Sequence, residues 1–117
     1  MVFIRKRFGK IFEVIMQTLT LVRINTELHW ECHRTESGNW VAVCHPLNVT
    51  VQSETWAELM EDMADTVDAI LQDLLISHEL PRFLREHGWE AVGPLPEPDG
   101  AVRFDIPFIP AIMSSYA

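Results

Sequence analysis

The fold is decided by residues 40–74, which read WVAVCHPLNVTVQSETWAELMEDMADTVDAILQDL. Residues 40–45 form a β-rich run, and apolar and polar residues alternate from Leu47 to Gln52. A period of two is typical of strands with one buried face. Pro46 cannot donate a hydrogen bond to a sheet, so a strand is expected on each side of it. After Thr55 the apolar period becomes 3.6, which predicts a helix to about Ser77 with an apolar stripe of Trp56, Leu59, Met60, Met63, Val67, Ile70, Leu71 and Leu74. Thr55 followed three residues later by Glu58 is a capping-box pattern at the helix start.

Residues 18–33 alternate in the same way and predict one further strand. The segment RTESGN at residues 34–39 carries a Ser-Gly-Asn turn signal, so this strand and the one beginning at Trp40 are expected to form a hairpin. The three strands together predict a meander.

The C-terminal part holds weaker signals. Residues 80–87 predict a short helix closed by Gly88, since glycine accepts the left-handed conformation at a helix end. The prolines at 94, 96 and 98 predict a turn-rich connection, and residues 101–108 alternate as a last strand. Pro107 and Pro110 are expected to limit regular structure beyond it.

These elements predict an α+β fold in which a small antiparallel sheet of three strands, with a fourth near 101–108, packs on one long amphipathic helix. The fourth strand either extends the sheet or exchanges into a neighbouring chain, and since both arrangements mask a sheet edge, a homodimer or higher homo-oligomer is expected. One domain is predicted over residues 16–117, with 94–117 as a proline-rich arm or strand. Residues 1–15 form a basic extension, which is either an amphipathic arm or translated sequence upstream of a start at Met16.

The net charge of −8 is unevenly distributed, because four of the nine basic residues precede residue 16. From Met16 onward the chain has 5 basic and 16 acidic residues, so direct nucleic-acid binding is not expected and a small basic protein is the favoured partner.

The apolar run at residues 11–16 is far shorter than the roughly 18 residues that a membrane span needs, so no membrane association is expected. Two cysteines are too few for a disulfide framework, which predicts a reduced, cytoplasmic protein.

Carboxylates recur along one side of the predicted helix at steps of three and four residues. Such a stripe is either a solvated outer face or a docking strip for a basic partner. The docking interpretation is favoured by the fact that like charges four residues apart cost some helix stability. The residues predicted to contact a partner are Glu54, Glu58, Glu61, Asp65 and Asp68, with Asp62 and Asp73 at the margin.

Potential zinc ligands gather in the predicted hairpin, at His29, Cys32, His33, Cys44 and His45. Strand alternation places His29 and His33 on the face opposite Cys32, and the Cys-x-x-Cys spacing of zinc sites is absent. Cys44 and His45, as neighbours on a strand, are badly placed for a mutual hydrogen bond. No catalytic residue, metal ligand or cofactor is therefore predicted. The alternatives are a metal- or ligand-binding protein or enzyme that uses these residues, and a structural oligomerisation module.

Residues 38–71 resemble the HicB-like antitoxins. The matching residues are Gly38, Trp40, Ala42, Pro46, Thr55, Glu58 and Leu59, and with the preceding strand the resemblance covers roughly residues 18–78. It implies a partial RNase H-like fold of three antiparallel strands and a helix. It also implies a toxin-antitoxin system, in which the chain neutralises a small basic HicA-type ribonuclease by covering its catalytic histidine. Residues 80–117 do not resemble the DNA-binding segments that many relatives carry, so autoregulation by DNA contact is not implied.

Overall fold

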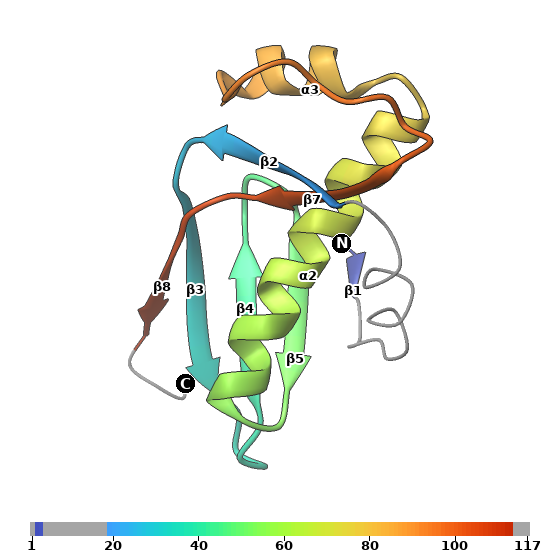
Figure 1. Ribbon diagram of the computed structural model, residues 1–117. Coiled ribbons are helices and arrows are strands. Elements are labelled where there is room, and N and C mark those ends of the chain that lie inside the picture. The colour runs from blue at the N-terminus through green and yellow to red at the C-terminus, as the bar shows by residue number, and fades with distance from the viewer. Residues whose placement is uncertain (1, 4–18, 114–117) are drawn as a thin grey trace. The chain divides into compact units, whose positions relative to one another are not determined.

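The computed structural model describes residues 2–3 and 19–113 (Figure 1). These residues form two compact units, each assembled from separate stretches of the chain. Of the described residues, unit 1 contains 2–3, 27–66 and 108–113, and unit 2 contains 19–26 and 67–107. The expected basic extension over residues 1–15 lies outside the described residues, except for Val2 and Phe3.

Unit 1 contains a five-stranded sheet in the order β1-β5-β4-β3-β8 (Figure 1). Its strands are β1 (Val2–Phe3), β3 (Leu28–Arg34), β4 (Trp40–Cys44), β5 (Val49–Ser53) and β8 (Phe108–Ile112). β4 is antiparallel to both of its neighbours, with Ala42 opposite Cys32 on β3 and opposite Val51 on β5. The predicted hairpin and third strand are therefore confirmed. The wholly antiparallel sheet is not, because β1 and β8 run parallel to the strands beside them.

The turn between β4 and β5 explains how the chain reverses without a glycine. The N–H of Asn48 donates to the carbonyl of His45 at 3.0 Å, with Pro46 at the second turn position. Asn48 has a φ of 56°, in the left-handed region that asparagine tolerates better than most residues. Pro46 thus lies between two strands, as its missing donor requires.

Strand β8 corrects the expectation that prolines end regular structure in the tail. The N–H of Met113 donates to the carbonyl of Cys32 on β3 at 2.8 Å. Because backbone groups point alternately to the two sides of a strand, the nitrogen of Pro110 faces away from β3. Its missing donor therefore costs β8 no hydrogen bond with β3, and it interrupts the outer edge against a further strand.

Helix α2 (Trp56–Ile76) begins and ends as the sequence predicts, within one residue. At its start, the N–H of Glu58 donates to Oγ1 of Thr55 at 3.1 Å, which is the cap half of the predicted capping box. At its end, the N–H of Glu79 donates to the carbonyl of Leu74 at 2.9 Å, while His78 takes the left-handed conformation with a φ of 63°.

The core of unit 1 lies between one face of its sheet and the first part of α2. Trp30 is 1% exposed, and the other core residues are similarly buried: Leu28, Cys32, Ala42, Cys44, Val49, Val51, Leu59 and Met63. Polar groups enter this core as well. Oγ of Ser53 on β5 donates to Oδ2 of Asp62 at 2.6 Å, whereas Oδ1 of Asp62 and Oγ1 of Thr66 are buried with no partner among the described residues.

Unit 2 contains the three-stranded sheet β6-β2-β7, helix α3 and the second part of α2. The elements are β2 (Leu19–Asn25), α3 (Leu80–His87), β6 (Glu90–Ala91) and β7 (Ala101–Asp105). α3 ends at Gly88, which has a φ of 70° and confirms the predicted cap. The predicted last strand exists as β7, but it pairs in parallel with β2 in this second sheet, with Val22 opposite Phe104, and does not extend the first sheet.

The single strand expected over residues 18–33 is two strands that belong to different sheets. The break lies at Thr26, whose N–H turns back to the carbonyl of Ile24 at 3.0 Å. Alternation continues in phase across the break, since Ile24 and Leu28 are both buried. Periodicity alone therefore cannot reveal it.

Asp68 joins α2 to the outer edge of β7 within unit 2. Its Oδ1 accepts the N–H of Phe104 at 2.7 Å, and its Oδ2 accepts Nε2 of Gln72 at 2.8 Å. The same Gln72 nitrogen donates to the carbonyl of Val102 at 2.8 Å, and a guanidinium nitrogen of Arg103 lies 3.3 Å from Oδ2. The two helix side chains thus satisfy edge groups of β7 that a neighbouring strand would otherwise pair.

Replacement of Asp68 by alanine is expected to lower the free energy of unfolding by about 2–4 kcal/mol, because it leaves the buried N–H of Phe104 without an acceptor. The matched control is Asp73→Ala, an exposed carboxylate on the same helix, which is expected to cost about 0.5 kcal/mol or less. Urea unfolding followed by circular dichroism measures both. Equal losses in the two variants would contradict the role given to Asp68.

Candidate functional site

The described residues of unit 1 are strongly acidic. Residues 27–66 and 108–113 hold eight carboxylates and one arginine, Arg34, which gives a formal charge of −7. The described residues of unit 2 also hold eight carboxylates, but with four arginines, for a formal charge of −4. Among the described residues, unit 1 therefore carries the larger share of the negative charge, which favours a cationic partner.

Four of the five predicted contact residues lie in unit 1 on accessible positions, and we call them the acidic stripe: Glu54, Glu58, Glu61 and Asp65. Glu54 and Glu61 are exposed, and Glu58 and Asp65 are partly exposed. Steps of three and four residues from Glu58 to Asp65 place the three helical members along one side of α2. Their carboxylates can therefore meet a partner together.

Asp68 does not belong to this surface, although its spacing predicts that it should. It is 7% exposed, and its carboxylate is bonded to β7, as described above. Asp62, predicted at the margin, is 5% exposed and bonded to Ser53. The buried positions of α2 change along its length, from Leu59, Asp62, Met63 and Thr66 to Val67, Asp68, Leu71 and Leu75. An exposed stripe that continues through residue 68 is therefore wrong.

The potential metal ligands of the hairpin are divided between two faces of the sheet, as alternation predicts. Cys32 and Cys44 are free thiols, both 0% exposed. His29 and His45 are exposed, and Nε2 of His45 lies 3.4 Å from Oε1 of Glu31 across the hairpin. Among residues 2–3 and 19–113, no three side chains of the ligand types are grouped to hold a metal ion.

Burial sets the chemistry of the two thiols. Desolvation raises the pKa of Cys32 from 9.0 to about 11. Desolvation also raises the pKa of Cys44, against the opposing effect of a backbone hydrogen bond at Leu47. A nucleophilic cysteine needs a lowered pKa, so both thiols are suited to packing and not to attack.

A cluster of large side chains lies where β3 ends and where β4 and α2 begin. The sequence did not predict that these side chains come together. The ring centroids of Trp40 and Trp56 are 4.9 Å apart in an edge-to-face arrangement. Cζ of Arg34 lies 5.4 Å from the Trp40 ring centroid. We call these three residues the aromatic corner. The available signal was the position of the two tryptophans, one at a strand start and one directly after a helix cap.

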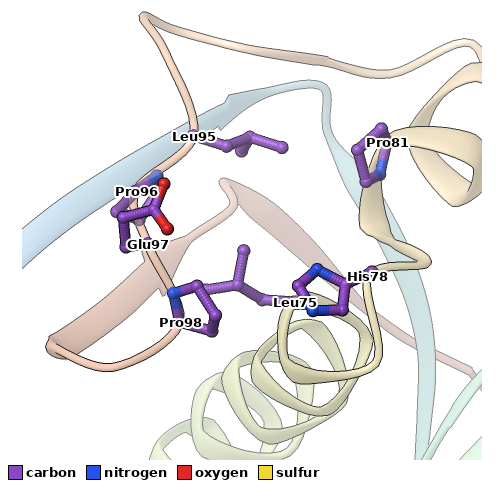
Figure 2. Close-up of a pocket in the computed structure, with 7 residues that line it drawn as sticks. All are labelled: Leu75, His78, Pro81, Leu95, Pro96, Glu97 and Pro98. Carbon is purple, nitrogen blue, oxygen red and sulfur yellow. The ribbon is translucent and has the colours of Figure 1, made fainter.

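A small hollow in unit 2 lies between the end of α2, the start of α3 and the proline-rich connection. Figure 2 shows its lining, formed by Leu75, His78, Pro81, Leu95, Pro96, Glu97 and Pro98. Its volume of about 190 Å³ is below the roughly 300–1,000 Å³ of typical small-molecule sites. Its lining is mostly proline and leucine, which is consistent with packing of the connection against the helices.

The chain matches no family model, no curated protein and no solved structure. None of the helices in the described part of the chain is both long and apolar enough to cross a membrane.

The raised thiol pKa values predict a loss of stability at high pH. The folded state holds the Cys32 proton up to about pH 11, whereas the unfolded thiol releases it near 9.0. The contribution of the Cys32 thiol to the free energy of unfolding is therefore fully present below pH 9.0 and is lost as the pH rises through about 11. Urea unfolding at pH 8 and pH 10.5 should show a larger decline in the wild type than in Cys32→Ala. An equal decline in both proteins would show that Cys32 does not contribute.

Proposed function

We propose that this chain is an antitoxin-like binding module that neutralises a small basic HicA-type ribonuclease by protein contact, without catalysis of its own. The observation that carries the proposal is the charge of unit 1, where eight carboxylates and one arginine lie in the described residues. Complementary charge accelerates association and selects a cationic partner over a neutral one.

The acidic stripe is the surface proposed to receive that partner. Helix α2 holds Glu58, Glu61 and Asp65 on one side, and the Thr55 cap fixes where that helix begins. Carboxylates presented by a rigid helix lose less entropy on binding than carboxylates on a loop, so the stripe is preorganised for lysine and arginine side chains.

The order of elements in unit 1 supports a HicB-like assignment. β3, β4 and β5 form three consecutive antiparallel strands and lead directly into α2, which is the arrangement that the resemblance over residues 38–71 implies. The parallel edge strand β8 is an addition to that arrangement. In the proposed mechanism the bound module covers the active site of the ribonuclease, so inhibition needs only a stable complex.

The proposed function does not include nucleic-acid binding, and self-association of the chain stays a prediction. The acidic surface of unit 1 would repel phosphate groups, so binding of the module to RNA or DNA is not proposed. A homo-oligomer remains expected, but Pro110 disfavours its formation through the outer edge of β8, because that edge lacks a central donor.

Reversal of two charges on the stripe tests the proposal. Glu58→Lys/Glu61→Lys is expected to weaken binding of the small basic protein encoded beside this chain by about 10- to 100-fold, mainly through slower association. The matched control is Glu90→Lys/Asp99→Lys, which makes the same change in net charge at exposed positions of unit 2. Association and dissociation rates at two salt concentrations, together with growth on co-expression, provide the readout.

Two results would overturn the proposal. In the first, the wild-type module neither binds nor neutralises the neighbouring protein. In the second, the stripe variant and the control lose affinity equally, which would assign the effect to net charge and not to this surface.

A further inference from the structure

The aromatic corner is held rigidly by the fold. Arg34 and Trp40 are opposite each other in the β3–β4 ladder, and Trp40 is opposite Ser53 on β5. Trp56 is the first residue of α2, placed by the cap at Thr55. Two ladders and one helix cap therefore fix the edge-to-face contact of the two tryptophans before any partner binds.

The corner differs from the aromatic core of the same unit in its access to water. Trp30 is 1% exposed, whereas Trp40 and Trp56 are both only partly buried. Tryptophan and arginine at the surface are the residue types most often found as energetic centres of protein interfaces. A rigid pair of partly exposed tryptophans offers contact area at little cost in conformational entropy.

Carboxylates lie close to the corner along the chain. Glu54 follows Ser53, the ladder partner of Trp40, and precedes the cap residue Thr55. Glu36 lies in the turn that joins β3 to β4. A cation that reaches the tryptophans therefore also approaches Glu54, the first member of the acidic stripe.

The chain itself shows which cation suits these rings. The guanidinium of Arg34 lies over Trp40, with its Cζ 5.4 Å from the ring centroid, and donates to the carbonyl of Gly38 at 3.4 Å. A guanidinium is planar and weakly hydrated, so it stacks on an aromatic face and still donates to a carboxylate in its own plane. A lysine ammonium is compact and strongly hydrated, and gains less from the same rings.

We propose that the aromatic corner is the anchor of the interface and that it binds an arginine side chain of the partner, stacked on the Trp40–Trp56 pair and paired with Glu54. This inference takes the basic character of the partner from the proposed function. It adds that arginine is the residue type recognised and that the aromatic corner is where it binds. Lysines of the partner contribute attraction to the acidic stripe, whereas arginine supplies the specific contact.

The test uses two peptide probes of equal charge, nona-arginine and nona-lysine. Binding to the full-length chain is followed by calorimetry and by the indole N–H signals of the tryptophans in NMR spectra. Nona-arginine is expected to bind about fivefold more tightly than nona-lysine and to shift the Trp40 and Trp56 signals. Trp56→Leu is expected to bring the two affinities to parity, while the matched control Trp89→Leu in unit 2 retains the preference.

Trp40→Phe is a second variant that keeps an aromatic ring in the ladder, and it should reduce the preference if Trp56→Leu perturbs the start of α2. Equal affinity of the two peptides for the wild type, no binding of either, or an unchanged preference in both corner variants would overturn the inference. Failure of the antitoxin function would appear separately, as absent neutralisation on co-expression while the peptide preference and its loss in the variants persist.

Discussion

Asp68 satisfies a sheet edge from within a helix, and much of unit 2 depends on that contact. Its carboxylate accepts the N–H of Phe104, and through Gln72 the helix also reaches the carbonyl of Val102. β7 is an edge strand, and without these two side chains its outer backbone groups would lack partners. The contact fixes α2 against β7 and so determines which side of this part of the helix is buried.

This constraint divides the carboxylates of α2 by role. Asp62 and Asp68 are buried and bonded inside their own units, whereas Glu58, Glu61 and Asp65 retain access to water. Glu58, Glu61, Asp65 and Asp68 follow one another at steps of three and four residues, but their surroundings differ. Only the accessible carboxylates can attract a cationic partner, and they lie in the unit that also holds the aromatic corner. The proposed electrostatic attraction and the proposed arginine contact therefore both belong to one small unit.

Local signals predicted the elements well, and non-local pairing accounts for the differences. The cap at Thr55, the end of α3 at Gly88 and the alternation of β3 to β5 each depend on neighbouring residues, and each is confirmed. The break at Thr26 was missed because alternation continues in phase across it. The parallel pairing of β7 with β2, and of β8 with β3, joins strands more than 75 residues apart in the sequence. Asp68 was wrongly predicted to be exposed, because its carboxylate accepts a hydrogen bond from β7. Helical spacing carries no information about that distant strand.

Carbodiimide labelling of the native chain, mapped by mass spectrometry, distinguishes the carboxylates that α2 buries for the fold from those that it leaves accessible to a partner. Amidation depends on access of the reagent to each carboxylate. Glu54 and Glu61 are expected to react fastest and Glu58 and Asp65 more slowly, with Asp62 and Asp68 protected until the chain is unfolded. Labelling of Asp68 as fast as Glu61 in the folded protein would show that the Asp68 carboxylate is accessible and is not held by β7.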